Sequence, residues 1–366
     1  MPKNTSALTP QTVRFRTRDP FQQYVRSRVE RHLRMIGRQR HGGARFMLKS
    51  ATIMAWLITS YVLLVFFAHS WPVAIIAALN LGLAAAGVGF NIQHDAGHRA
   101  ISKNKHVNWL MALSLDLMGG SSYLWDVKHN KLHHTYTNID GHDDDIDLGF
   151  LARFAPTQPH YWFHRYQHIY MWFLYTCVIL KWHIIDDFRD VAVAKIGPHP
   201  IDRPKGKDLI AFIAGKLAFT FFAFVLPMLF HNPLVVLFWY VISMGIGGLV
   251  LSVVFQLAHV VENAAYPLPS PTTGDMEEAW AIHQMRTTVD FAQKSKLLTW
   301  YLGGLNYQAE HHILANVSHL HYPRIARIVA RACKRYNVPY NVHPTFWDGI
   351  VSHARQLRTL GQTSPA

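Results

Sequence analysis

Four stretches of the chain are long, apolar and almost free of charge, and they occur in two closely spaced pairs. Residues 51–69 and 72–90 form the first pair, and residues 209–230 and 234–258 form the second. At about 1.5 Å per residue, the shortest stretch spans roughly 28 Å as a helix, close to the hydrocarbon thickness of about 30 Å. Buried core helices of soluble proteins rarely stay uncharged for so long. The pattern predicts four transmembrane helices in two hairpins, and an all-α integral membrane protein.

Two weaker apolar stretches, residues 109–118 and 166–182, are interrupted by polar or charged side chains. This pattern favours interfacial or re-entrant helices over full spans. Lys216 is the one charge within the second hairpin. We expect its aliphatic stem to follow the helix and its ammonium group to reach the membrane surface.

The charge distribution predicts the orientation. Residues 1–50 carry 12 Lys or Arg and 2 acids, and residues 313–366 carry 7 and 1, within a chain of net charge +14. The positive-inside rule then places both termini and the long segment between the hairpins in the cytoplasm. We expect a basic cytoplasmic segment at 1–50, a membrane domain at 51–330 and a basic cytoplasmic tail at 331–366, in a multi-pass protein of the cell membrane.

Several kinds of cofactor and partner are excluded by what the chain lacks. Its two cysteines, Cys177 and Cys333, form no CxxC pair and no CxxCH haem motif. No glycine-rich nucleotide loop and no nucleic-acid-binding signature is present. The first 50 residues hold no apolar signal segment. An enzymatic activity would therefore need a cofactor bound by other side chains.

Histidine supplies those side chains, since the chain has 24 of them. They cluster in HDAGH at 94–98, HNKLHH at 129–134 and QAEHH at 308–312, and one more ends the fourth apolar stretch. A single HxxxH pair is more often a solvated pair on a helix, but the predicted topology puts all these clusters on the cytoplasmic face. Imidazole binds iron, copper, zinc and nickel, and eight candidates exceed the needs of one ion. The pattern predicts a cytoplasmic histidine-rich cap with two metal ions, and the candidate ligands are His94, His98, His129, His133, His134, His259, His311 and His312.

At these motifs the sequence resembles the integral-membrane fatty acid desaturases. The resemblance rests on HDAGH at 94–98, HNKLHHTYTN at 129–138 and QAEHH at 308–312, in this order, and covers roughly residues 50–330. It implies that the eight histidines hold two iron ions at the cytoplasmic face of a four-span helical domain. It also implies a reaction in which O2 and two electrons remove two hydrogens from an acyl chain and leave a cis double bond.

The third motif opens with Gln308, where many members of that family have histidine. This substitution resembles the front-end, linoleoyl-type branch, which introduces the double bond on the carboxyl side of the chain. An amide is a poorer iron ligand than imidazole, so we expect Gln308 to hydrogen-bond a ligand or a water. Other expected supports of the ligands are Asp95, Glu262, Asn263, Asp126, Asp140, Asp143, Asp144, Asp145 and Asp147.

The run GHDDDID at 141–147 has two other interpretations, an acidic surface loop or a contact to the pantetheine or lipid head of the substrate through Asn138 and its neighbours. Tyr123, Trp125 and Tyr307 flank the motifs and are candidates for the wall of a substrate channel, although aromatic residues there are also ordinary packing. The remaining histidines are expected at the membrane interface (His160, His164, His168, His183), in loops (His142, His199, His283, His343) or as contacts that support the ligands or bind a lipid headgroup (His319, His321).

The substrate implied by the resemblance is a long-chain acyl-CoA or a phospholipid acyl chain, and the sequence does not choose between them. No HPGG haem motif of a fused cytochrome b5 domain is present, so electrons are expected from a separate ferredoxin, cytochrome b5 or flavoprotein reductase. The basic ends offer that partner a landing surface, or else they bind anionic lipid. A membrane hydroxylase is the nearest rival function. A metal transporter is disfavoured because the candidate ligands cluster at one face and the interiors of the spans are apolar.

Overall fold

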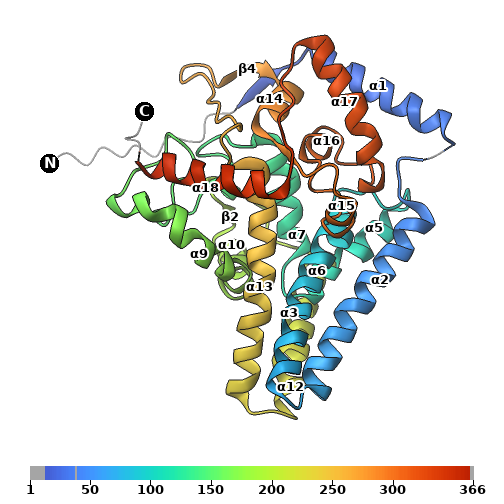
Figure 1. The fold of residues 1–366 in the computed structure, drawn as a ribbon, viewed down its shortest axis with the longest axis vertical. Helices are drawn as coiled ribbons and strands as arrows, with labels where there is room; N and C mark the ends of the chain where they lie inside the picture. The colour runs from blue at the N-terminus through green and yellow to red at the C-terminus, as the bar shows by residue number, and fades with distance from the viewer. Residues whose placement is uncertain (1–12, 38, 363–366) are drawn as a thin grey trace.

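The computed structural model describes residues 13–37 and 39–362, and its long helices extend from one end of a helical cap (Figure 1). The first twelve residues of the expected basic N-terminal segment and the last four of the C-terminal tail lie outside the described residues. The first hairpin consists of α2 (Gly43–Val62) with η1 (Leu63–Phe67), and α3 (Trp71–Val88) with η2 (Gly89–Gln93) and α4 (His94–Gly97). The second consists of α11 (Lys207–Thr220) with η7 (Phe221–Val225) and α12 (Leu226–Met228), and α13 (Pro233–His259).

Local sequence explains where the hairpins turn. Pro233 begins α13, and the Asn232 side chain accepts a hydrogen bond from the Leu234 amide and so caps the helix. Pro72 lies in the first turn of α3, where its missing amide hydrogen costs nothing. The four apolar stretches do form long helices that pair as two hairpins. Their ends nearest the cap differ from the prediction, because the helix of the first span begins at Gly43 and that of the second continues to Gly97.

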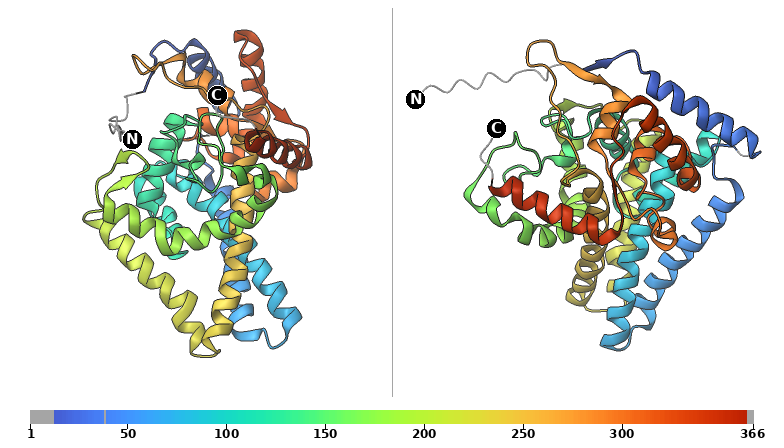
Figure 2. Two further views of the ribbon diagram at one scale, coloured as in Figure 1. Left: turned by 90° about the vertical axis from the view of Figure 1, so that its left-hand side faces the viewer. Right: turned by 45° about the horizontal axis from the view of Figure 1, so that its top comes forward.

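A fifth helical segment is also long and apolar enough to cross a membrane, by length and composition alone. It joins η5 (Trp162–Tyr166), α9 (Gln167–Lys181), η6 (Trp182–Asp186) and α10 (Asp187–Val193) into one run. In Figures 1 and 2 it runs across the long axis of the hairpins, where α9 packs on α13. A Cβ at Gly248 of α13 would lie 2.8 Å from the backbone oxygen of Tyr175, so glycine permits this close crossing. This orientation agrees with the interfacial or re-entrant helix expected at 166–182.

The interior of the protein corrects three expectations about polar side chains near this run. Lys216 does not reach the membrane surface, because its ammonium group lies 2.6 Å from Asp187 and its side chain is mostly buried. His164 and His183 are buried rather than interfacial. The ring of His164 bonds the backbone oxygen of Phe150, and that of His183 contacts the Tyr240 hydroxyl. Each of these three buried side chains has a polar partner, as burial requires.

The cap consists of shorter elements packed above the hairpins. Its helices are α1 (Pro20–Met35), α5 (Lys105–Ala112), α6 (Ser114–Leu117), α7 (Ser122–Trp125), η3 (Asp126–His133), α8 (His134–Tyr136), η4 (Asp144–Ile146), α14 (Trp280–Thr287), α15 (Lys296–Tyr301), α16 (Gln308–Ile313), η8 (His319–His321), α17 (Tyr322–Tyr336) and α18 (Phe346–Gln362). The described residues also contain three two-stranded sheets, which the all-α prediction lacked. They pair β1 (Arg14–Arg16) with β4 (Asp275–Ala279), β2 (Lys195–Ile196) with β3 (His199–Pro200), and β5 (Asp290–Phe291) with β6 (Val342–His343).

Two hydrophobic clusters bind the chain ends to the cap. The first joins α1, α14, α16 and α17, and the second joins α9 and α18 to the half of α13 nearest the cap. Residues 50 and 331, where the sequence divides by charge, lie inside α2 and α17. Both basic ends therefore contribute helices that pack against the elements carrying the histidines.

Candidate metal centre

The structure brings all eight predicted ligand histidines together in the interior of the cap. Each is buried, with at most 9% of its surface exposed. They come from four places that are distant in sequence, namely the end of the α3 helix, η3 with α8, the last residue of α13, and α16. Polar rings gathered in the interior are costly unless they bind something. Their convergence therefore indicates a site rather than ordinary packing.

The ring nitrogens form two groups. His94, His98, His129 and His311 offer ligand atoms within 4.8 Å of one another, and so do His133, His259 and His312. His134 lies between the groups. Its ring nitrogen is 3.2 Å from that of His129, and it also falls within the same limit of His311 and His312. The arrangement provides two adjacent sets of nitrogen ligands, as the count of histidines predicted.

A wide helical turn explains how the second motif serves both groups. The motif lies in η3, which has π-helical hydrogen bonding. A π turn holds more residues than an α turn, and such turns are frequent at functional sites. The wider turn brings His129 and His134, five residues apart, into contact. His133 groups with His259 and His312, and its ligand atom also lies within 4.8 Å of those of His129 and Asp145. On an α-helix the four-residue step from His129 to His133 would place these two rings on one face, whereas the π turn also brings His129 and His134 together.

In four of the rings one nitrogen, here called the outer nitrogen, contacts a hydrogen-bond acceptor or a hydroxyl group of a neighbouring residue; the other is called the inner nitrogen. Nδ1 of His133 lies 3.1 Å from the Asp143 carboxylate, and Nδ1 of His259 lies 3.2 Å from the backbone oxygen of Thr287. Nδ1 of His312 is 2.7 Å from the Gln284 side-chain oxygen, and Nδ1 of His311 is 3.4 Å from the Tyr322 hydroxyl. Such partners fix the tautomer and the ring orientation of a metal-binding histidine.

The inner nitrogens of the same four rings have no hydrogen-bond partner among the described residues. They are Nε2 of His133, His259, His311 and His312, joined by Nε2 of His98 and Nδ1 of His94. Six buried ring nitrogens without partners at one place are exceptional, because buried polar atoms almost always find one. Bound cations would satisfy them, and the imidazole donor set suits iron. The residues therefore fit the two metal ions predicted from the sequence.

Burial and mutual repulsion keep most of these imidazoles neutral, as a metal ligand must be. Burial, together with neighbouring imidazoles, lowers the pKa of five rings well below the usual value, those of His98, His129, His134, His311 and His312. His133 is the exception. Burial lowers its pKa, but the Asp143 carboxylate and its hydrogen bond bring it above the usual value.

The acidic run at 141–147 folds back onto η3 and supports it. Besides the contact to His133, the Asp143 carboxylate accepts hydrogen bonds from the amides of Asn138 and Asp145. Asp144 and Asp145 lie 2.8 and 3.3 Å from the ammonium group of Lys128. Asn138 is fully buried, and its amide group donates to the backbone oxygens of His259 and Ala265. The expectation of a lipid-headgroup contact through Asn138 is therefore wrong.

Asp95 supports the first motif from the other side. Its carboxylate is 2.9 Å from Nδ1 of His319 and 3.2 Å from the Ser318 hydroxyl, and Nε2 of His319 is 2.8 Å from the Lys49 ammonium. This network ties the end of the α3 helix to α2 and to the segment before α17. It gives His319 the supporting role that was one of its expected interpretations.

Gln308 is buried, and its side-chain oxygen has no hydrogen-bond partner among the described residues. Its neighbour Glu310 shows a feature that the sequence did not reveal. The Tyr340 hydroxyl lies 2.9 Å from both the Glu310 and the Asp290 carboxyl groups, and Asp290 accepts the Ala309 amide at the start of α16. Burial and the nearby Asp290 raise the pKa of Glu310 well above its usual value. This cluster anchors the helix that carries His311 and His312.

Other expected supports lie elsewhere. Glu262 and Asn263 are exposed on the turn that follows α13, which corrects the expectation that they contact the ligands. Tyr123 bonds the backbone oxygen of Asp202, and Tyr307 bonds that of Gln293, so both serve in packing. Trp125 does lie against the site, because its ring stacks on His129 at a centroid distance of 4.5 Å.

Three supporting residues were missed by the sequence analysis: Gln284, Thr287 and Tyr322. Gln284 and Thr287 lie in α14, a polar segment without a recognisable motif, and Thr287 acts through its backbone. Tyr322 follows the third motif by ten residues. No spacing rule connects these positions to the histidines, since the contacts form only when α14 and α17 pack on α16. His283, expected in a loop, is likewise buried in α14.

The fold and the site together define a multi-pass membrane metalloprotein with a dinuclear histidine centre in its cap. The sequence profile of the family described as "Fatty acid desaturase" matches residues 69–344. The chain therefore belongs to the fatty acid desaturase family, and the predicted activity, an oxidoreductase that desaturates fatty acyl chains, is confirmed at that level.

Individual relatives cover nearly the whole chain. It is 38% identical over 351 residues to an acyl-lipid (8-3)-desaturase of Physcomitrium patens, covering 94% of this chain and 72% of the relative. It is 34% identical over 359 residues to an sn-1 linoleoyl-lipid 6-desaturase of Synechocystis sp., covering 98% of this chain and all of the relative. A protein of the same description from Arthrospira platensis is 36% identical over 341 residues, or 93% of this chain and 92% of the relative.

Proposed function

We propose that the protein is an acyl-lipid desaturase of the front-end type, which introduces a cis double bond on the carboxyl side of a lipid-bound acyl chain. The observation that carries the proposal is the pair of adjacent histidine groups with six unpartnered inner nitrogens. The lipid substrate is supported by the relatives named as lipid 6-desaturases, which this chain matches over almost its full length. Gln308 at the head of the third motif supports the front-end branch.

In this proposal one iron ion is held by His94, His98, His129 and His311, and the other by His133, His259 and His312. His134, which lies between the two groups, is the eighth ligand. Two such ions, when bound, supply the oxidant formed with O2 that an unactivated methylene C–H bond requires. The reaction balances as –CH2–CH2– plus O2, two protons and two electrons, giving –CH=CH– and two water molecules. Asp95, Asp143 and Gln308 support the ligands in place.

The protein's own side chains orient the site and exclude water from it. Asp143, Gln284 and the backbone oxygen of Thr287 hold the outer nitrogens, so the rings present their inner nitrogens without rearrangement. Trp125 covers His129, and Phe255 contacts His133 and His259 at centroid distances of 4.9 and 4.8 Å. Apolar rings around the centre keep it dry, which protects a reactive oxidant from side reactions.

We place the cap and both termini on the cytoplasmic side of the cell membrane, as the basic ends predict. The substrate chain then enters from the bilayer, and the electrons come from a separate carrier protein such as a ferredoxin, cytochrome b5 or flavoprotein reductase. The proposal favours a phospholipid acyl chain over acyl-CoA, because the relatives are described as acting on lipids.

Expression in a desaturase-deficient host tests the reaction. Mass spectrometry of total fatty acids should show products two mass units lighter than their precursors, with the double bond on the carboxyl side. A gain of sixteen units would indicate hydroxylation and refute the proposal. Incubation of purified protein with labelled phospholipid or labelled acyl-CoA tests the carrier, and faster conversion of acyl-CoA would refute the lipid assignment.

Ligand variants test the site. His94→Ala, His133→Ala and His312→Ala should abolish the product and lower the iron content, while the protein still inserts in the membrane. His69→Ala is the matched control, because His69 is exposed at the first hairpin turn, far from the cap. Full activity in any of the three ligand variants would contradict the assignment.

A further inference from the structure

Two basic helices, α1 and α17, pack together at the end of the molecule opposite the hairpin turns (Figure 1). We call their exposed surface the basic crest. It carries nine cations, and α17 contains no acidic residue. The nine are Arg26, Arg28, Arg31, Arg34, Arg324, Arg327, Arg331, Lys334 and Arg335. The single acid, Glu30, lies 3.9 Å from Arg34 within the same helix. The crest is therefore a strongly positive surface.

Aromatic rings hold part of this charge in place. The guanidinium groups of Arg28 and Arg335, from different helices, lie 5.1 and 5.0 Å from the centre of the Tyr24 ring. Arg335 also lies over Tyr336 of its own helix. Cations fixed on aromatic faces lose less freedom when a partner binds, which favours recognition of a surface over simple solvation.

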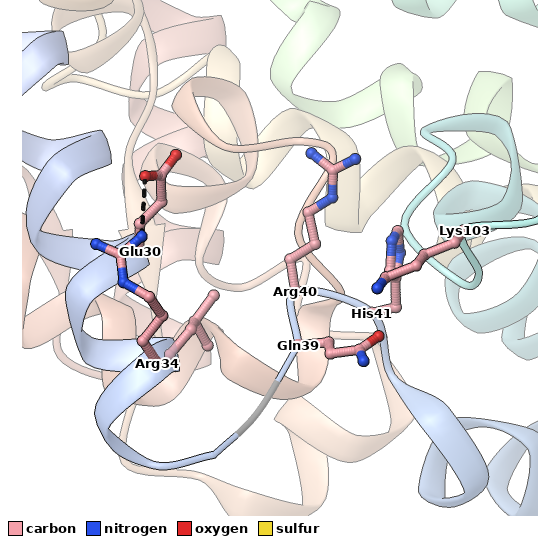
Figure 3. A pocket seen from close by; sticks show the side chains of 7 residues that line it. Glu30, Arg34, Gln39, Arg40, His41 and Lys103 are labelled. Carbon is pink, nitrogen blue, oxygen red and sulfur yellow. Dashed lines mark ion pairs between the residues drawn. The ribbon is translucent and has the colours of Figure 1, made fainter.

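A pocket extends the crest toward the loop that follows the first histidine motif. Arg34 at the end of α1 lines it together with Arg40, His41, Lys103 and the acidic Glu30. Figure 3 shows Arg34 paired with Glu30 on one side, and Arg40, His41 and Lys103 on the other. The backbone oxygen of Arg40 accepts the Ser318 amide, and the Ser318 hydroxyl contacts Asp95. Two hydrogen bonds, both made by Ser318, thus connect Arg40 in the wall of the pocket to Asp95, which supports the metal site.

The inner face of α17 reaches the centre directly. Tyr322, its first residue, is buried with its hydroxyl 3.4 Å from Nδ1 of His311. Arg327 is exposed five residues further along, about 7.5 Å of helical rise. A protein bound on the crest would therefore lie close to the metal site. The backbone of α17 and the contact between Tyr322 and His311 would connect the two.

We propose that the basic crest is the docking surface for an acidic, soluble one-electron carrier protein. The inference rests on the proposed function, since that reaction consumes two electrons per double bond. Each docking delivers one electron and oxidises one carrier, so two carriers are consumed, while the two protons come from water. The crest lies away from the membrane-spanning helices, which favours a soluble partner over an anionic membrane surface (Figure 2). Opposite charge on the two partners speeds such encounters.

Charge reversal on α17 tests the surface in the full-length protein reconstituted in lipid nanodiscs. The crest variant is Arg327→Glu with Arg331→Glu and Lys334→Glu. The control variant is Lys294→Glu with Arg355→Glu and Arg358→Glu, which changes the net charge equally at exposed positions on α18 and before α15. The probe is an acidic [2Fe–2S] ferredoxin, kept reduced by its reductase and NADPH for turnover and used oxidised for binding.

We expect the crest variant to raise both the KM and the Kd for ferredoxin about 10-fold or more relative to the control variant. Single turnover after reduction with dithionite bypasses the carrier, and should be equal in the two variants. Equal ferredoxin binding and KM in both variants would overturn the proposal. So would a defect that appears only in nanodiscs rich in anionic lipid while ferredoxin binding is unchanged, because the crest would then serve the membrane.

The same experiment separates the two proposals. If the wild-type protein forms no double bond after dithionite reduction and exposure to O2, the proposed function fails. The comparison of ferredoxin binding between the crest and control variants still supports or overturns the docking surface, since it needs no turnover.

Discussion

Replacing Asp143 with asparagine should weaken metal binding in the His133 group. The Asp143 carboxylate accepts from Nδ1 of His133 at 3.1 Å, from the Asn138 amide at 2.9 Å and from the Asp145 amide at 3.1 Å. All three neighbours donate, whereas an asparagine side chain offers one acceptor and one further donor. The variant therefore leaves at least one buried donor facing another donor.

The size of the effect follows from two known costs. An unsatisfied buried donor costs about 1–3 kcal/mol. Loss of an outer partner of a metal-binding histidine lowers metal affinity about 10- to 100-fold, or about 1.4–2.8 kcal/mol. Because His133 groups with His259 and His312, we expect the ion of that set to be lost first while the other remains.

Iron content per protein, measured by mass spectrometry after incubation with increasing chelator, checks this expectation. Asp143→Asn should fall from two ions toward one at a chelator concentration that leaves the wild type loaded. Asp147→Asn is the control, because Asp147 is an exposed residue of the same loop that accepts from the Gly149 amide. Equal retention of iron in both variants would refute the view that Asp143 holds a ligand in place.

Three further outcomes are expected. Gln308→Ala should reduce product formation less than His312→Ala and should retain iron, and complete loss of iron would show that the amide is a ligand. Burial lowers the pKa of His353 to about 4, so this ring is neutral in the folded state. Because the unfolded chain binds the proton more readily, the free energy of unfolding decreases as the pH falls from 6.5 toward 4. Thermal unfolding should show wild-type stability falling by about 2 kcal/mol more than that of His353→Gln between pH 7 and 5. Gly303→Ala should lower the melting temperature and the iron content far more than Gly141→Ala. Both glycines have a positive φ, but a Cβ at residue 303 would lie 2.3 Å from a backbone oxygen of η2, whereas a Cβ at residue 141 would meet nothing within 4 Å.

Much of the architecture could be predicted because it depends on local composition. An uncharged stretch of about twenty residues has few stable alternatives to a membrane-spanning helix. The turns at Ser70 and Asn232 are marked by polar residues and by prolines that begin the next helix. The crossing segment at Trp162–Val193 was harder to interpret, because length and apolarity are the same for a spanning helix and for one lying across a bundle.

Closeness in sequence to a ligand histidine did not predict which residues contact the histidine rings. Glu262 and Asn263 follow His259 closely, yet the chain turns outward after α13 and exposes both. Gln284, 28 residues away from His312, contacts it instead. In the sequence Asp143 could not be distinguished from the other acids of its loop as a partner of a ligand. Only the packing of the loop on η3 shows that it is Asp143 that contacts His133. The π turn that joins His129 to His134 was also invisible, since its sequence differs little from that of an α-helix.

The sequence by itself determined the class of protein, the two hairpins, the eight histidines and the positive charge of the two ends, because each depends on residue type and short-range pattern. The tertiary structure alone decided how the histidines divide into two groups, which neighbours hold their outer nitrogens, and that the two basic ends meet as α1 and α17. These features arise from contacts between segments far apart in the chain. The physical reason is that an imidazole's orientation, and hence its use as a ligand, depends on the acceptor at its outer nitrogen, and that acceptor is supplied by packing.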